Sequence, residues 1–223
     1  MLLILRLLFL LHMAPQVFNI PPMGIRFLTF CFLAILSISV NSRPVSYPGG
    51  FTLMAKSDSL QNSVYIHYSP TYKYAIGLER KKDKRINDHY TLLRFTYLVN
   101  RKNTDNSQRN LYFQSGYSLD SNENFFFGIH GDWETRRYFI GFDLKKVEAI
   151  NQDYSEQKYQ IGFAPYLGEY GDLHTWIMLK TTKNSITDTT STYPCLKFFK
   201  GDNLLEVGYN GKTNWDFHFM HRF

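Results

Sequence analysis

The chain has 223 residues, enough for one domain after removal of an export signal, and aromatic residues make up 17% of it. Beyond residue 42, 23 basic residues face 19 acidic ones, an excess too small and too scattered to indicate nucleic-acid binding. The same part has no run of roughly 18 uncharged apolar residues, which excludes a helical membrane anchor there. Cys31 lies in the expected export signal, so Cys195 remains alone and excludes a disulfide framework.

Residues 1–42 have the layout of a secretory signal peptide. A short basic start, Met23–Arg26, precedes the apolar stretch Phe27–Val40, and small or tolerated residues follow at a cleavage site. A second apolar stretch, Met1–Ala14, lies upstream and is separated from the first by prolines. We therefore expect either a long leader or a true start at Met23. One or two anchoring helices within residues 1–40 are the alternative.

The rest of the chain, residues 43–223, alternates with a period of two. Tyr74, Ile76 and Leu78 share one face of an expected strand, for example, and Ala75 and Gly77 lie on the other. The weakest of the expected strands are the first and the tenth, so ten strands are the alternative to twelve. The twelve expected strands are 51–56, 63–68, 72–80, 89–100, 110–119, 124–134, 137–147, 157–166, 173–182, 193–200, 203–210 and 214–223.

The connections between these strands are turn-rich and favour antiparallel neighbours, since a parallel pair needs a long crossover. An even strand number places both termini on the periplasmic side, as in single-chain bacterial barrels. Long polar connections are then expected outside the cell, at 81–88, 148–156 and 183–192. Short ones are expected inside, at 69–71, 134–136 and 201–203. The polar run 101–109 is an exception, because it falls on the periplasmic side.

A soluble β-sandwich would also have alternating strands and frequent turns. The crowding of Tyr, Phe and Trp on the more apolar face favours lipid contact instead, and polar or small residues occupy the other face. We therefore predict an all-β fold, a single antiparallel up-and-down transmembrane β-barrel in the bacterial outer membrane. Its partners would be outer-membrane lipid and lipopolysaccharide, with no nucleic acid.

The last nine residues resemble the terminal strand of bacterial outer-membrane proteins, which alternates aromatic residues and ends on Phe. In that class of proteins the terminal strand is recognised by the barrel assembly machinery. The resemblance implies that the machinery would recognise this chain through Trp215, Phe217, Phe219 and Phe223.

Several longer segments resemble an uncharacterised family of proteobacterial outer-membrane β-barrels. The most specific is GFAPYLGEYGDLHTW at 162–176, and Phe51 departs from the pattern because the family usually has Trp there. Some members are labelled as accompanying heavy-metal transporting ATPases. The resemblance implies an exported envelope protein and supplies no catalytic residue. The other segments are SYPGGF at 46–51, HYSP at 67–70, FFKGDNLLEV at 198–207 and the terminal RF at 222–223.

The inward face of the expected barrel gathers imidazole and thioether groups. Together these groups suit copper, and sulfur favours Cu(I). In the alternative interpretation, Met fills gaps in a packed interior and His makes ordinary hydrogen bonds. No two of these His lie at a chelating spacing on one strand, so a metal site would have to form between strands. The candidates are His67, His130, His174, His218, Met54, Met178 and Met220.

Charged residues of both signs are also expected inside. Because buried charges are costly unless they are paired, they indicate either a salt-bridged plug or a narrow charged pore. The acidic candidates are Glu79, Asp132, Asp143, Glu206 and Asp216. The basic candidates are Arg94, Arg137, Lys145, Lys197 and Arg222.

An enzyme would need a nucleophile and a base. His67 and Ser69 lie two residues apart on one face, a spacing that resembles outer-membrane lipid deacylases, and Asp172 with His174 is a second acid–His pair. Pro70 favours a turn-initiating Ser instead. The sequence therefore predicts a closed or narrow barrel with a structural or binding role and no enzyme activity. A small ion or copper channel and a lipid-directed hydrolase are the alternatives.

Overall fold

The structure, a computed structural model, confirms the twelve strands. It describes residues 44–120, 124–149, 152–168, 171–211 and 214–223, so the expected leader and its start at Met23 lie outside the described residues. The strands are β1 (Gly50–Ser57), β2 (Gln61–Thr71), β3 (Tyr74–Asp83), β4 (Asp88–Asn103), β5 (Ser107–Ser118), β6 (Phe125–Thr135), β7 (Tyr138–Glu148), β8 (Tyr154–Phe163), β9 (His174–Asn184), β10 (Thr189–Lys200), β11 (Asn203–Asn210) and β12 (Asn214–Arg222).

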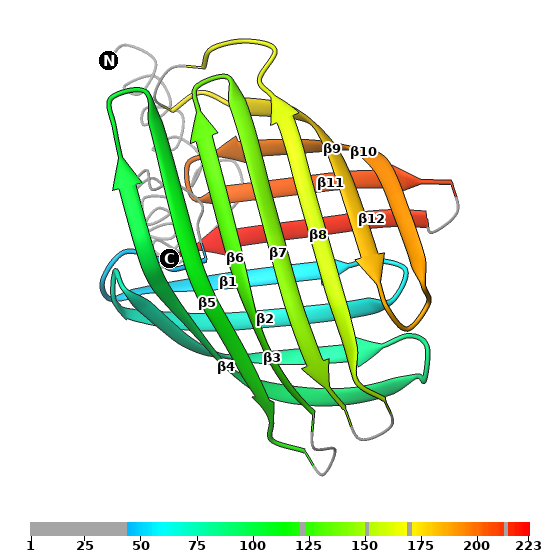
Figure 1. Ribbon diagram of the computed structural model, residues 1–223. Helices are drawn as coiled ribbons and strands as arrows, with labels where there is room; N and C mark the ends of the chain where they lie inside the picture. The colour runs from blue at the N-terminus through cyan, green and yellow to red at the C-terminus, as the bar shows by residue number, and fades with distance from the viewer. Residues whose placement is uncertain (1–43, 121–123, 150–151, 169–170, 212–213) are drawn as a thin grey trace, which may run out of the picture. The chain divides into compact units, whose positions relative to one another are not determined.

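Each strand pairs antiparallel with its neighbours in sequence, and β1 pairs with β12 to close the barrel (Figure 1). The closing pair runs in register from Thr52 opposite Arg222 to Ser57 opposite Phe217. Beyond it, the amide N of Phe51 donates to the carbonyl O of Phe223 at 3.4 Å, and the reverse bond is 3.0 Å long. Closure removes the two free edges that an open sheet would have. In the described part of the chain, no helix has the length and hydropathy needed to cross a membrane.

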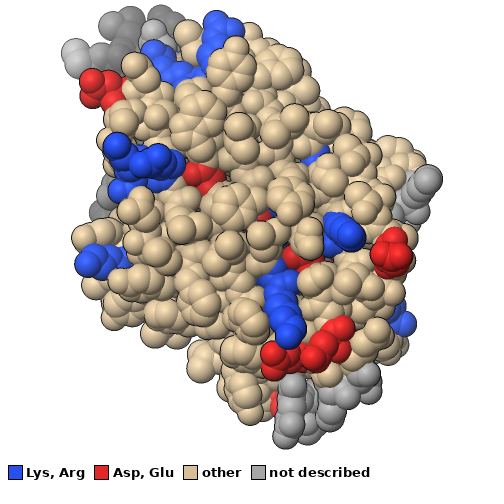
Figure 2. Space-filling model, viewed as in Figure 1, with Lys and Arg blue, Asp and Glu red and all other residues tan. Residues whose placement is uncertain are grey.

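Apolar side chains cover the outside of the barrel. On β2, Val64, Ile66 and Tyr68 face outward with 53%, 47% and 40% of their surface exposed. Figure 2 shows one face of the molecule, which is mostly uncharged and has its charged residues in small separate groups. A water-soluble protein rarely exposes apolar surface this continuously, whereas a lipid-facing wall requires it. The architecture is that of the bacterial outer membrane, the location that the sequence predicts.

Two polar segments that the sequence places in loops are strand. The expected outer loop 183–192 is instead a four-residue turn, 185–188, between β9 and β10. Thr189–Thr192 extend β10 because β-branched Thr fits a pleated sheet although it is polar, and Thr181 and Thr192 hydrogen-bond across the pair at 3.0 Å. The run 101–109 likewise contributes only the turn 104–106, because Arg101–Asn103 of β4 pair with Gln108–Asn110 of β5.

The three connections expected outside are four or five residues long and the three expected inside are two residues long, so the predicted difference keeps its direction but is small, and one connection reverses it. The connections at the end opposite the termini are three to six residues long. The longest connection, 164–173, lies at the end that carries the termini. This connection begins at Ala164 because β8 ends at Phe163, three residues before the expected end of that strand at residue 166. Pro165 follows Ala164 and lacks the N–H that a continuing ladder needs.

Gly77 marks a close approach between β2 and β3. A Cβ added there would lie 2.1 Å from the carbonyl O of Ile66 and 2.5 Å from the Cα of His67. Both are backbone atoms, so a side chain at this position would force the two strands apart. Gly77 therefore fixes the spacing of two neighbouring strands in the closed sheet.

We predict that Gly77→Ala lowers the free energy of unfolding by about 1–3 kcal/mol, the usual cost of overpacking. The measurement is urea unfolding of the refolded protein in lipid vesicles. Gly211→Ala is the control, because a Cβ at Gly211 meets no atom within 4 Å. Equal stability of the two variants would contradict the role given to Gly77.

Candidate functional site

The barrel encloses a cavity of about 570 Å³, called the chamber here. At the end that carries the termini, it is lined by the β4–β5 turn at Thr104–Asn106 and by Arg136 of the β6–β7 turn. At the other end it reaches Asp58 of the β1–β2 turn. The chamber therefore extends along most of the barrel. Its size is in the range of small-molecule binding sites and far exceeds the space of a few trapped waters.

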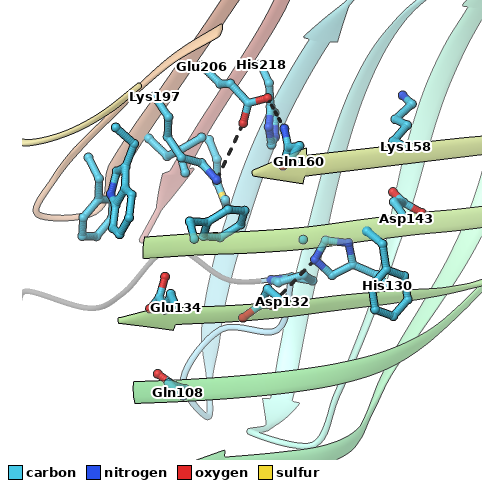
Figure 3. Close-up of a pocket in the computed structure, with 18 of the residues that line it drawn as sticks. Gln108, His130, Asp132, Glu134, Asp143, Lys158, Gln160, Lys197, Glu206 and His218 are labelled. Carbon is cyan, nitrogen blue, oxygen red and sulfur yellow. Dashed lines mark hydrogen bonds and ion pairs between the residues drawn. The ribbon is translucent and has the colours of Figure 1, made fainter. Parts of the chain in front are cut away.

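A network of charges lines one wall of the chamber. Lys180 Nζ on β9 donates to Glu206 Oε1 on β11 at 3.0 Å and lies 2.6 Å from Asp216 Oδ2 on β12. Glu206 Oε1 also accepts a bond of 2.7 Å from Gln160 Nε2 (Figure 3). Tyr193 donates to Asp216 at 2.6 Å. The bonds join strands that are two or three places apart in the sheet. They offset the cost of burying these charges and hold the wall in shape.

One ion pair crosses the lumen. Lys158 Nζ on β8 lies 3.8 Å from Asp58 Oδ2 in the turn after β1. Four strands separate β8 from β1 in one direction around the barrel and six in the other, so the pair spans the lumen at this depth. Burial raises the pKa of the Asp58 carboxyl, but Lys158 and the backbone N–H groups of Leu60 and Gln61 lower it to below its ordinary value. Asp58 is therefore ionised at neutral pH and restricts the chamber.

Arg94 occupies the opposite wall of the lumen. Its Nη1 donates to Glu79 at 2.9 Å and its Nη2 to Gln114 at 2.9 Å. The guanidinium also lies 4.4 Å from the ring centroid of Tyr65 and 5.2 Å from that of Phe126. Bidentate bonding together with stacking on aromatic rings is characteristic of arginine, and it fixes the position of this cation.

A second, smaller cavity of about 30 Å³, called the narrow passage here, lies beside the chamber at the end opposite the termini. The two share Lys56, Arg94 and Lys158 as lining residues. The narrow passage also contacts Asn124, which lies in the connection between β5 and β6, at the end opposite the termini. The lumen thus contains the chamber along most of its length and, beside it at the end opposite the termini, the narrow passage.

Aromatic and polar side chains line the chamber nearer the termini. Phe139 and Trp176 make an edge-to-face pair with ring centroids 6.1 Å apart, and the ring centroids of His174 and Phe199 are 6.4 Å apart. Val45 closes part of this end from inside, where it packs with Ala75, Leu98 and Tyr112. The interior is therefore neither a uniformly wet pore nor a dry core.

The structure places all seven residues predicted for metal binding inside the barrel, but on several walls. Met54 and Met220 lie opposite each other in the β1–β12 register, and His218 is two residues from Met220. The three line the chamber, as do His130 and His174, whereas His67 and Met178 are buried elsewhere in the interior. Among the described residues, no three His, Cys, Asp or Glu side chains form a group suited to a metal. A copper site stays a prediction, for which Met54, Met220 and His218 are the best-placed residues.

The expected Ser–His pair is not assembled for catalysis. Ser69 Oγ accepts a 3.0 Å bond from the backbone N–H of Ser46, and both ring nitrogens of His67 have no hydrogen-bond partner. Both side chains are buried, with 0% and 1% of their surface exposed. Asp172 lies in the exposed connection before β9. This geometry gives no support to the lipid-directed hydrolase.

Nine of the ten charged residues expected inside the barrel are inward. The exception is Arg137, which is exposed in the β6–β7 turn because β7 begins only at Tyr138. Lys56, Lys158 and Lys180 are also inward, although they were not among the residues predicted from the sequence. Each follows another inward residue by two positions, so continuing the alternation along β1, β8 and β9 would have found them.

No protein-family model and no curated protein matches this sequence, so the resemblance to the proteobacterial family stays a prediction. Solved structures of porins do match. A KdgM porin in complex with disordered oligogalacturonate has a TM-score of 0.51 and 12% identity, over 78% of this chain and 99% of that one. A second structure, titled KdgM porin, has a TM-score of 0.49, again at 12% identity, over 78% of this chain and 98% of that one. The first match shows that the fold is a porin-like barrel.

We predict that Lys180→Met lowers the free energy of unfolding by about 3–5 kcal/mol, because Glu206 and Asp216 would lose their central cation while still buried. Urea unfolding in vesicles measures this. Lys183→Met is the matched control, since Lys183 lies on the exposed face of the same strand and should change stability by less than about 0.5 kcal/mol. A loss of the same size in both variants would show that the network does not stabilise the barrel.

Proposed function

We propose that this chain is a narrow outer-membrane channel for small charged solutes, with its termini on the periplasmic side. The observation that carries the proposal is the chamber, which runs from the turns at the terminal end to Asp58 at the other end. The apolar outer surface would contact membrane lipid and, in the outer leaflet, lipopolysaccharide. The porin-like fold supports a channel but does not identify a solute.

Several features of the lumen support a narrow channel. The chamber walls carry fixed charges of both signs, which replace part of the hydration of a small charged solute and disfavour apolar ones. The Asp58–Lys158 pair across the lumen and the narrow passage beside it limit the size of what passes. A barrel of twelve strands has an interior between the filled small barrels and the wide porins.

We predict discrete, small single-channel currents for the refolded protein in a planar lipid bilayer. Asp58→Ala should raise the conductance of each channel, because it removes the carboxylate that holds Lys158 across the lumen. Asp120→Ala is the control at the same end of the barrel. It removes an ion pair of 3.2 Å to Arg80, whose side chain is on the outer surface, so the lumen is unchanged.

Each outcome separates the channel from the structural alternative. A folded protein that carries no current in the wild type or in Asp58→Ala would overturn the channel and favour a structural or binding role. A current that Asp58→Ala leaves unchanged would retain the channel but remove Asp58–Lys158 as its constriction. Heat-dependent gel mobility shows in each case that the barrel is folded.

We also propose that the terminal strand is the part of this chain that the barrel assembly machinery recognises. Trp215, Phe217 and Phe223 are outward, and Phe223 is 60% exposed at the end of the strand. Phe223 pairs with Phe51 through its backbone, which closes the barrel. Its ring packs edge to face on that of His221, with centroids 4.6 Å apart, and its exposed surface remains accessible to a partner.

We predict that Phe223→Ala reduces the amount of folded barrel in cell envelopes while refolding of the purified protein into detergent is unchanged. Tyr209→Ala is the control, since Tyr209 is an outward aromatic residue of the neighbouring strand, 50% exposed. Heat-dependent gel mobility of envelope fractions measures the folded amount. If both variants assemble as well as the wild type, the terminal aromatic residue is not part of the signal.

A further inference from the structure

The narrow passage has an excess of positive charge. Only two carboxylates, Glu79 and Glu156, line it. The positive residues that line it number five: Lys56, Lys81, Arg94, Lys145 and Lys158. Like charges gathered in a space shielded from bulk water repel each other, unless an anion lies between them.

Three of the five cations have a carboxylate within 4.0 Å. Arg94 contacts Glu79 at 2.9 Å, Lys145 contacts Asp143 at 3.4 Å and Lys158 is 3.8 Å from Asp58. The Nζ of Lys81 lies over the ring of Tyr90, 5.7 Å from its centroid. With Asp58 and Asp143 included, the surroundings hold five cations and four carboxylates. Among the described residues that line the narrow passage, Lys56 is the cation with neither a carboxylate within 4.0 Å nor an aromatic ring beneath it.

Lys56 has no hydrogen bond or ion pair within 4.0 Å to another described residue, although its side chain points into the lumen of the barrel. Its three donors are therefore available to a ligand. An ammonium group at this position has no carboxylate within 4.0 Å among the described residues, which makes its charge costly at a site partly removed from water.

Arg94 provides a second donor at the same place. It is 6% exposed, lines both the chamber and the narrow passage, and has a buried Nε without a hydrogen-bond partner. The space of about 30 Å³ corresponds to about two waters. A chloride or bromide ion fits such a volume, whereas a sugar or a chain of sugars does not.

We infer that the narrow passage is a binding site for a halide-sized inorganic anion, which Lys56 holds together with Arg94 and Lys158. This deepens the proposed function, because such a site would make the narrow end of the lumen prefer anions. Binding itself rests only on the charges and the space of the narrow passage. The two proposals therefore fail separately.

Binding is tested by the line width of the ³⁵Cl NMR signal as the refolded wild type in a zwitterionic detergent is added to chloride. Lys56→Met keeps the length of the side chain and removes the charge, and Lys56→Gln is a second variant if the first does not fold. In the Lys56 variants we expect the chloride affinity obtained from the protein-dependent broadening to fall about tenfold, which corresponds to the loss of one charged contact. Lys183→Met, on the outer face, is the control and should bind as the wild type does.

Equal broadening by the wild type and the Lys56 variants, or none by the wild type, would overturn the anion site. Transport is measured separately, as the reversal potential across a bilayer in a potassium chloride gradient. We expect anion preference in the wild type and a shift toward cations in Lys56→Met. A current without that shift overturns the selectivity role of Lys56, whereas chloride binding without any current overturns the channel and keeps the site.

Discussion

The hydrocarbon interior of a membrane offers no partner for backbone N–H and C=O groups, and the whole architecture depends on this constraint. A sheet meets it only by closing on itself, and here β1 closes on β12 with the last bonds made between Phe51 and Phe223. Once the sheet is closed, the alternation of side chains along each strand determines which residues face outward and which face inward. Every second side chain meets lipid, and the others share one confined interior.

That confinement explains the character of the lumen. Charges placed inside a narrow barrel have limited access to water, so each needs a partner on another strand. The bonds of Lys180 to Glu206 and Asp216 meet this need in one wall, and the bond of Arg94 to Glu79 meets it in the opposite wall. The pair of Asp58 and Lys158 meets the same need across the lumen and makes the lumen narrower. The interactions that make the interior polar therefore also fix its shape, and Lys56 is the described cation beside the narrow passage that has no carboxylate within 4.0 Å.

Alternation of side chains was enough to predict the twelve strands, the closed barrel and the inward position of residues such as Glu206 and Met220. Loop lengths could not be predicted in the same way, because Thr189–Thr192 are polar yet extend a strand. The pair of Asp58 and Lys158 across the lumen could not be predicted from the sequence either. Which residues meet across a barrel depends on the tilt and stagger of all twelve strands, and no local pattern encodes that.

The short turns opposite the termini have a consequence for the cell surface. None of the six connections at that end is longer than six residues. With the termini in the periplasm, as proposed, the part of the protein that projects beyond the lipid is correspondingly small. The proposed channel would therefore present little of its own chain to the exterior of the cell.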